Sequence, residues 1–568
     1  MRSGDTSELR KHRGAFFTPL PIADFLADWA TSGDIASVVL DPTCGEAVFL
    51  AAAARRLQQR GRTTKQLRTQ LRGYDLHGPS LEWAAKLLAD TNADATLTQG
   101  DFFSVPAPGE GDPGLVDAII GNPPFVRYQR HSGISRDNSK QAALAQGVRL
   151  SNLASAWAAM LVHSCGFLKR DGRLAMVLPA ELLTVDYAEP VRAWLKARFE
   201  QVHLVLLEKP QFPDASEKVV LLLASGSGGC DAFSLYFLRD ASDLQNVRPM
   251  SGQAATVASS GKWNALQLTN GQRSILERHT ADRFERVANY GSPRLGSVTG
   301  ANHFFTMTET DRIKRGLTEN DRQVQKICPS QSKFTGGLHY TIDHWARSRD
   351  AGERVWLFRP DPDDSSQAVT EYVCSGEHDG VHEGYKCRSR DPWWRSPAVA
   401  APDLFFTYMS HRNPRLIKNS ANITMLNSMH GIRINADAPQ ITARALPLLF
   451  LNSLTLLTCE VSGRWYGNGV LKLEPREAGK LPVPSFDALE EVWRTLSPMT
   501  RKLHAMWRSP DPLRVVEAID QLLLVDTLGI DVGDVKSLAS GLVTLRNRRL
   551  AKQPQLESAS KTPVLIDS

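Results

Sequence analysis

Residues 38–46 read VVLDPTCGE, an apolar run that ends in an acid and continues into a turn with one glycine. Comparable apolar runs recur through the first ~230 residues, with helical spacing between several of them. They cover residues 38–41, 71–75, 95–101, 116–122, 173–179, 202–207 and 219–224. This alternation predicts an α/β domain with a mainly parallel sheet covered by helices, and the closely spaced last runs predict an antiparallel hairpin at its edge.

Unusual polar groups stand where four of these strands are expected to end. Asp41, Asp75 and Asp101 each close an apolar run, and Asn122 opens the sequence NPPF. In a doubly wound sheet, ligands bind at the carboxyl ends of the strands, so we expect these groups to line one cleft. Each acid alone is more typical of a turn or a cap. Their order and spacing together favour a binding site.

The loop that runs from Asp41 to Glu46 indicates the ligand. A dinucleotide phosphate requires two or three glycines and a helix N-terminus free for anions, whereas this loop has one glycine and two acids. Acids suit a ligand with a sulfonium and an ammonium group. Asp75 is placed to accept hydrogen bonds from ribose hydroxyls, and Asp101 from an exocyclic adenine amine with Phe102 against the ring. We therefore predict that the ligand is S-adenosylmethionine.

The run Asn122-Pro123-Pro124-Phe125 is the most specific feature. Two prolines remove two N–H donors, so the backbone offers carbonyl acceptors, and the Asn122 side chain adds another. Acceptors on both N–H groups of an aryl amine favour its pyramidal form and free its lone pair for attack on a methyl group. Phe125 offers a flat apolar face for an extruded base. The alternative is a proline-rich turn after a buried strand.

These residues resemble the gamma-class N6-adenine DNA methyltransferases, the TaqI-like group, in chain order from residue 15 to about 225. The matching order continues through the residues FFTP (16–19), FLKRDGR (167–173) and the pair Phe212-Pro213. The resemblance implies a Rossmann-like class I methyltransferase domain over 1–240 with a mostly parallel, seven-stranded sheet. The residues expected to hold S-adenosylmethionine are Phe17, Thr18, Pro19, Asp41, Thr43, Cys44, Gly45, Glu46, Asp75, Asp101, Phe102 and Asn122.

Glu46 departs from the family, most members of which have a small residue there. It either contacts the ammonium of the cofactor or caps the following helix. The resemblance further implies that an adenine of double-stranded DNA is flipped out and held by Asn122 and the Pro123 carbonyl, between Phe125 and Phe212. Rival hypotheses are methylation of an RNA base or a protein glutamine amide, and a DNA-binding protein that no longer turns over.

The second half of the chain loses the strand–helix alternation. Residues 265–485 resemble a mixed α+β target-recognition domain in the segments 295–305, 384–388 and 466–484, and residues 486–568 are predicted to be helical with a disordered tail. The span 383–420 holds seven basic residues and three acids, interleaved with aromatics. Its predicted DNA contacts are Lys386, Arg388, Arg390, Arg395, Arg412 and Arg415. Single residues here are equally compatible with a solvated surface.

The remaining features narrow the class of protein. Net charge is +6, which permits a polyanion partner without requiring one, and seven scattered cysteines suit a reducing cytoplasm. Residues 445–461 are too polar and short to span a bilayer. We predict a cytoplasmic monomer without metal that modifies double-stranded DNA without cleaving it, and the sequence leaves open whether a separately encoded restriction endonuclease acts beside it.

Two sequence features leave alternatives open. The run Cys374, His378, His382 and Cys387 is compatible with a zinc site or with a plain loop. The basic stretch 546–549 with Lys552 is predicted to lie on a helix, where it either touches phosphates or makes no contact.

Overall fold

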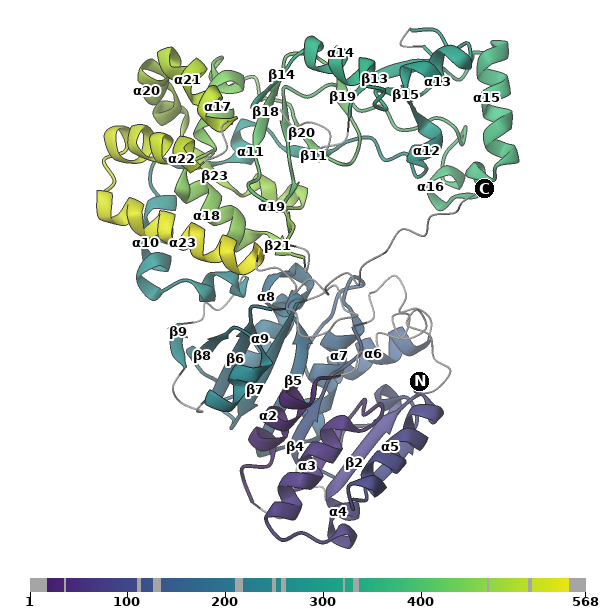
Figure 1. The fold of residues 1–568 in the computed structure, drawn as a ribbon, viewed down its shortest axis with the longest axis vertical. Helices are drawn as coiled ribbons and strands as arrows, with labels where there is room; N and C mark the ends of the chain where they lie inside the picture. Colours follow the sequence, from purple (N-terminus) through teal and green to yellow (C-terminus); the bar gives the residue numbers. More distant parts are fainter. Residues whose placement is uncertain are drawn as a thin grey trace, which may run out of the picture. The chain divides into compact units, whose positions relative to one another are not determined.

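The computed structural model describes residues 18–34, 37–109, 114–125, 134–209, 218–247, 252–256, 262–319, 322–329, 337–466, 469–508 and 513–550 (Figure 1). They form two compact units. The first unit comprises residues 1–270 with the short segments 464–469 and 547–568, and the second comprises 271–463 and 470–546. The two segments that return to the first unit come from far along the chain, so the units are not consecutive blocks of sequence. The predicted tail lies outside the described residues.

One large sheet organises the first unit. Its nine strands lie in the order β3 (Thr96–Gln99), β2 (Leu71–Asp75), β1 (Val39–Asp41), β4 (Val116–Gly121), β5 (Leu168–Pro179), β7 (Val219–Ser225), β6 (Gln201–Leu207), β8 (Ala232–Leu238) and β9 (Gln253–Thr256). Neighbours from β3 to β5 pair in parallel, whereas β7 is antiparallel to both β5 and β6. The mostly parallel α/β fold is therefore confirmed.

The sequence predicts seven strands, and the sheet has two more. β8 pairs in parallel with β6, and β9 pairs antiparallel with β8. Both follow the Gly/Ser-rich segment 225–229, which resembles a linker in sequence but forms the turn that returns the chain to the sheet edge. Hydrogen bonding of β8 to β6 and of β9 to β8, rather than a local sequence signal, places these strands.

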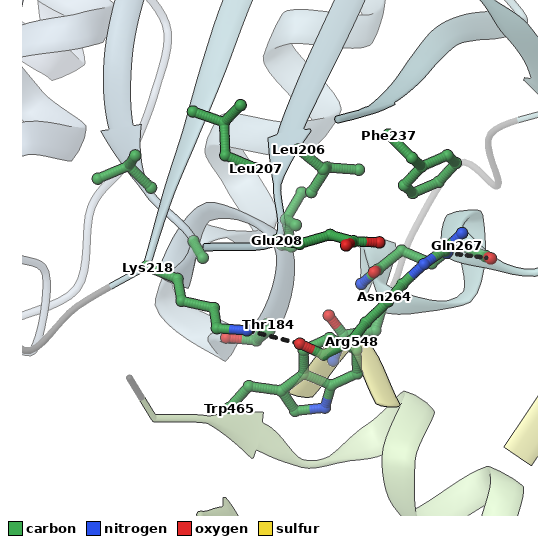
Figure 2. A pocket seen from close by; sticks show the side chains of 13 residues that line it. Thr184, Leu206, Leu207, Glu208, Lys218, Phe237, Asn264, Gln267, Trp465 and Arg548 are labelled. Atoms are coloured by element: carbon green, nitrogen blue, oxygen red, sulfur yellow. Dashed lines mark hydrogen bonds between the residues drawn. The ribbon is translucent and has the colours of Figure 1, made fainter. Parts of the chain in front are cut away.

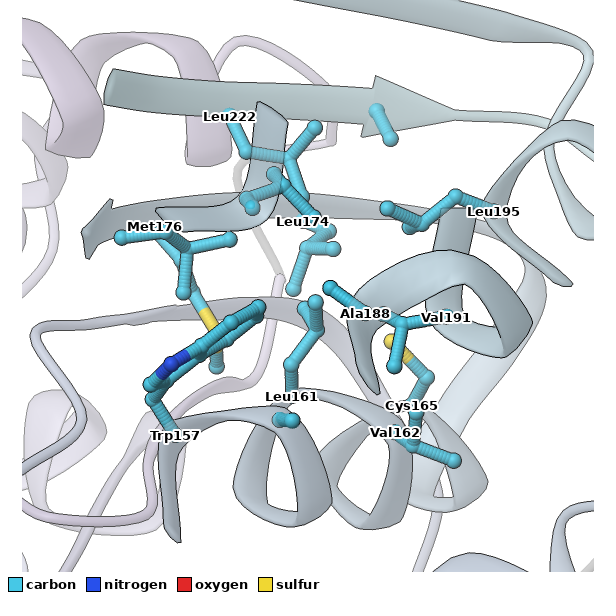
Figure 3. Close-up of a cluster of buried hydrophobic side chains, with 14 of the residues drawn as sticks. Trp157, Leu161, Val162, Cys165, Leu174, Met176, Ala188, Val191, Leu195 and Leu222 are labelled. Carbon is cyan, nitrogen blue, oxygen red and sulfur yellow. The ribbon is translucent and has the colours of Figure 1, made fainter. Parts of the chain in front are cut away.

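Helices cover both faces of the sheet, and strand alternation sends side chains to each (Figure 1). On one face, α2 (Leu20–Ala30) and α3 (Val48–Gln59) pack with Ala175 and Val177 of β5. On the other, α7 (Ala156–Ser164) and α9 (Glu189–Arg198) pack with the intervening residues of β5. Figure 3 shows Trp157 and Leu161 of α7 beside Leu174 and Met176. The remaining helices of this unit are α4 (Thr64–Gln70), α5 (Gly78–Asp90), α6 (Ile134–Ala145) and α8 (Glu181–Thr184).

The second unit is built from small sheets and helices. A five-stranded sheet has the order β11 (Pro293–Leu295), β20 (His430–Ile432), β16 (Leu404–Phe406), β18 (Leu416–Asn419), β14 (His339–Tyr340), and a four-stranded sheet the order β12 (Thr306–Met307), β15 (Trp356–Phe358), β13 (Val324–Cys328), β19 (Thr424–Met425). Its longer helices include α10 (Asn270–Thr280), α14 (Ile342–Asp350), α15 (Gln367–His378), α20 (Phe486–Leu496), α21 (Thr500–Trp507) and α22 (Leu513–Ile519). The long helix α23 (Val532–Leu550) follows them.

The apolar stretch 445–461 folds as two helices of this unit, α17 (Thr442–Leu449) and α18 (Ser453–Ser462). No single helix in the described part of the chain is long and apolar enough to cross a membrane. Helices α17 and α18 meet both conditions only when they are taken together, and the chain bends by 75° between them.

Candidate active site

The loop after β1 is tied to the end of β2 by two hydrogen bonds. The Gly45 N–H donates to Oδ2 of Asp75 at 2.9 Å, and the Cys44 N–H donates to the Tyr74 carbonyl at 2.8 Å. The other carboxylate oxygen of Asp75 accepts from the His77 N–H at 2.8 Å. The chain ends of β1 and β2 are thus brought together, and each Asp75 oxygen keeps a second lone pair for a ligand.

Asp41, the last residue of β1, is fully buried. Its Oδ1 accepts from the Thr43 N–H at 3.1 Å, while Oδ2 has no hydrogen-bond partner. Burial raises the pKa of Asp41 to about 8; the Thr43 hydrogen bond opposes this rise and the negative charge of Asp75 adds to it. A buried carboxyl with an unpaired oxygen is costly for the protein alone, and a cationic ligand would relieve that cost.

The end of β4 passes directly against Asp41. Gly121 has a φ of +153°, and a Cβ at this position would lie 2.8 Å from Oδ1 of Asp41. Only glycine adopts this φ without strain and has no Cβ to clash with the Asp41 carboxylate. Asn122 follows at once, and because it precedes Pro123 its backbone is restricted to extended conformations. The Asp41 carboxylate therefore lies against the residue that directly precedes Asn122.

The Asn122 side chain is held at one end only. Its Nδ2 donates to the hydroxyl of Thr18 at 3.3 Å, and its buried Oδ1 has no partner. Thr18 lies 104 residues earlier, just before α2, so the fold brings the predicted FFTP and NPPF segments into contact. Phe125 is half-buried and packs on the apolar cores of both sheet faces.

Three buried polar atoms of this site lack partners, namely Oδ2 of Asp41, Oγ1 of Thr43 and Oδ1 of Asn122. All three can accept hydrogen bonds, and Oδ1 of Asn122 can do nothing else. An acceptor-rich pocket with one carboxylate suits a ligand that carries N–H donors and positive charge. S-adenosylmethionine has both, so the residues present fit the predicted cofactor.

The segment that follows β3 carries the predicted site residues Asp101 and Phe102. Asp101 accepts from the Phe103 N–H at 3.0 Å, and His163 contacts the Phe102 carbonyl at 3.1 Å. Phe102 is 2% exposed and packs on Tyr74, His163 and Phe167. Its ring is part of the core, so contact with an adenine ring stays a prediction.

The predicted site residues also include Glu46, Phe17, Phe212 and Pro19. The N-cap of α3 is Ala47, which has no side-chain acceptor, so Glu46 is not the N-cap residue of that helix. Its contact with an ammonium group stays a prediction. Phe17 and Phe212 lie outside the described residues, and Pro19 is the N-cap of α2.

Three functional positions were not predicted from the sequence. Gly121 fixes the approach of β4 to Asp41, and its signal is a glycine directly before the Asn-Pro-Pro run. Gly73 does the same for β2, since a Cβ there would lie 2.9 Å from Sγ of Cys44. Leu76, next to Asp75, is 66% exposed, so its side chain is accessible beside the Asp75 carboxylate.

The predicted DNA-contact residues fall into two groups. Lys386, Arg388 and Arg412 are exposed. The other three are engaged within the second unit: the guanidinium of Arg390 donates to the Val298 carbonyl, Arg395 pairs with Asp361 at 3.2 Å, and Arg415 lies over the Trp507 ring at 5.8 Å. Burial lowers the pKa of Arg415 to about 10. These contacts favour structural roles for Arg390, Arg395 and Arg415.

The structure also describes the run of cysteines and histidines from Cys374 to Cys387 and the basic stretch 546–549. In the part of the chain that the structure describes, no group of three or more His, Cys, Asp or Glu side chains could hold a metal ion. The basic stretch 546–549 does lie on helix α23, but Arg549 is fully buried and donates to the Gly469 carbonyl. Arg548 donates to the Gln267 carbonyl at 2.8 Å and stacks on Phe237 at 3.8 Å.

Arg548 also lines a pocket of the first unit at the carboxyl ends of β5, β6 and β8 (Figure 2). Its carbonyl accepts from Nζ of Lys218 at 2.6 Å, and burial lowers the pKa of Lys218 to about 8. Glu208 and Lys218 flank the segment that carries Phe212.

Two family models match the chain. Residues 4–195 match the model described as N-6 DNA Methylase, which spans the strand ends and the Asn122 run. The chain is an N6-adenine DNA methyltransferase. Residues 260–524 of this methyltransferase match the C-terminal domain of Type II methyltransferase M.Eco57I.

Curated relatives are Type II methyltransferases. M.AccI of Acinetobacter calcoaceticus is 22% identical over 83% of this chain and 85% of its own length. M.XamI of Xanthomonas campestris pv. amaranthicola is 23% identical over 84% and 86%. A solved structure of the Type IIL restriction-modification enzyme MmeI in complex with DNA covers 93% of this chain and 76% of its own, with a TM-score of 0.58 and 11% identity. The last likeness supports the fold. None of these findings supports the RNA or protein-glutamine alternative.

Proposed function

We propose that this methyltransferase moves a methyl group from S-adenosylmethionine to N6 of an adenine flipped out of double-stranded DNA, using Asn122 and the Pro123 carbonyl as acceptors. The unpartnered, buried Oδ1 of Asn122 supports this proposal most directly. It is a buried acceptor without a donor, and Oδ2 of Asp41, at the end of the neighbouring strand, is another. A target amine and a cationic cofactor would supply the missing partners.

The strand-end residues would hold the cofactor, which supplies an electrophilic methyl group when bound. Asp41, whose carboxylate lies against Gly121, would face the positive charge of the cofactor, Asp75 would accept from ribose hydroxyls, and Asp101 would accept from the adenine amine. The exposed side chain of Leu76 offers apolar surface to the adenine ring. The loop from Thr43 to Glu46 closes the methionine end.

The target amine is activated by position and hydrogen bonds. Two acceptors on its N–H groups favour the pyramidal form, so the lone pair points away from the ring and toward the methyl group. No strong base is required, and the barrier falls mainly because the reacting atoms are held in line. Phe125 on one side and Phe212 on the other would stack on the flipped base, whose extrusion costs a few kcal/mol.

The second unit would read DNA. Lys386, Arg388 and Arg412 are exposed and able to neutralise phosphates. The DNA complex of MmeI, whose fold is similar, supports a DNA-binding role for this chain. As the relatives are Type II methyltransferases, we further propose that this enzyme modifies DNA as a monomer in the cytoplasm, beside a separately encoded endonuclease.

Expression in a host that lacks DNA methylation tests this function. The expected result is N6-methyladenine at one fixed sequence in host DNA, absent with Asn122→Ala. Methylation of cytosine, or no DNA mark from a folded enzyme that binds S-adenosylmethionine, would contradict the proposal.

A further inference from the structure

Thr18 occupies a fixed position at the edge of the sheet. It is 9% exposed and directly precedes α2, whose first turn is closed by N–H groups of Ile22 and Ala23 donating to the Pro19 carbonyl at 3.0 and 3.2 Å. The apolar side of α2 is buried against α3 and the sheet. The Thr18 hydroxyl is therefore held in place by the fold, independently of any ligand.

The Asn122 amide faces two choices of orientation. Its backbone is fixed by Gly121 and Pro123, but the terminal torsion of an asparagine side chain has a broad, roughly two-fold preference. One orientation aims Oδ1 at a target amine, and the other aims N–H donors at it. Since the amine must donate, only the first orientation permits catalysis.

We propose that Thr18 is a positioning residue that holds the Asn122 amide with Oδ1 directed away from α2, the orientation that the target amine requires. Its hydroxyl accepts from Nδ2 at 3.3 Å, which turns Oδ1 away from α2 and leaves it buried without a partner. This inference rests on the proposed function, since it assigns Asn122 to the target amine. It gives Thr18 a role toward the reacting group in addition to the cofactor contact that the family resemblance implies.

Substitution at Thr18 separates the two roles. Thr18→Val keeps the shape of the side chain and removes the acceptor, whereas Thr18→Ser keeps the hydroxyl. Thr31→Val is a matched control, because Thr31 lies at the other end of α2, is fully buried, and donates its hydroxyl to the Ala27 carbonyl at 2.8 Å. Each variant is assayed for its Kd for S-adenosylmethionine and its single-turnover rate on unmethylated plasmid DNA at saturating cofactor.

Thr18→Val is expected to lower the single-turnover rate at saturating cofactor about 5-fold to 10-fold, the value of one neutral hydrogen bond, whether or not loss of the cofactor contact also raises the Kd. Thr18→Ser should restore the rate, and Thr31→Val should leave it unchanged. A raised Kd with an unchanged rate at saturation would overturn the inference and limit Thr18 to cofactor binding.

Repeating the Thr18→Val substitution in an Asn122→Asp variant tests this inference separately from the proposed function. Asn122→Asp presents an acceptor oxygen in either orientation, so adding Thr18→Val to it should cost nothing further in rate. An equal loss in both backgrounds would contradict orientation as the cause. If Asn122→Ala itself leaves the rate unchanged, the proposed function fails; if Asn122→Ala abolishes methylation while Thr18→Val does not affect it, only the present inference fails.

Discussion

Asp41→Asn should remove a pH dependence that the buried carboxyl imposes on cofactor binding. Asp41 is fully buried, Oδ2 lacks a partner, and burial raises its pKa to about 8. With this pKa, about one molecule in ten carries the ionised carboxylate at pH 7 and about one in a hundred at pH 6. If the cofactor binds only the ionised form, its apparent Kd rises as that fraction falls.

The expected change is therefore about tenfold weaker binding between pH 7 and pH 6, or about 1.4 kcal/mol. Because binding requires the deprotonated carboxyl of Asp41, the affinity for the cofactor rises as the pH rises toward 8, and binding releases a proton. An α-amino group, with a pKa of about 7.7 to 8.0, stays largely protonated in this window, so the cofactor contributes little to the change.

Isothermal titration of S-adenosylmethionine in two buffers of different ionisation enthalpy measures both the Kd and the proton release. The wild type should release close to one proton near pH 6, and Asp41→Asn should bind more weakly with a flat profile. An identical pH dependence in both proteins would refute the role of Asp41.

Gly121→Ala would place a Cβ 2.8 Å from Oδ1 of Asp41 at a φ of +153°, so it should cost about 1 to 3 kcal/mol in urea unfolding and weaken cofactor binding; an unchanged midpoint and Kd would contradict that contact. His430 is fully buried with both ring nitrogens unpartnered, and burial lowers its pKa from 6.5 to about 4. The free energy of unfolding should therefore fall by up to about 1.4 kcal/mol per pH unit below pH 6.5, and His430→Phe should flatten that slope. The same slope in the wild type and in His430→Phe would mean that the ring is protonated in the native protein. Arg388→Ala should weaken DNA binding and reduce its salt dependence with unchanged thermal stability, whereas Arg395→Ala should instead lower stability because it breaks the pair with Asp361; the reverse pattern would exchange their roles.

The grouping of polar side chains at one edge of the sheet was predictable because strand ends carry local signals. Asp41, Asp75 and Asn122 each follow an apolar run, and parallel strands bring their carboxyl ends to one edge. The contact between Thr18 and Asn122 was foreseen only as shared membership of a site. Its geometry depends on how α2 packs, which no local pattern encodes.

The roles of individual side chains were less predictable, because burial depends on tertiary packing. Phe102 looks in sequence like a ligand-facing aromatic, yet it is enclosed by Tyr74, His163 and Phe167. Arg415 looks like a DNA contact and is buried over Trp507. Charge and spacing identified the region in each case, but not the direction of the side chain.

The rate of methyl transfer by Asn122→Ala, at saturating S-adenosylmethionine and with enzyme in excess over unmethylated plasmid DNA, measures the acceptor pocket itself. The predicted result is a loss of about 100-fold to 1,000-fold, as for removal of a single preorganised hydrogen-bonding group, with the cofactor Kd and the melting temperature close to those of the wild type. Methyl transfer to adenine at the wild-type rate by this variant would show that the amine is held elsewhere.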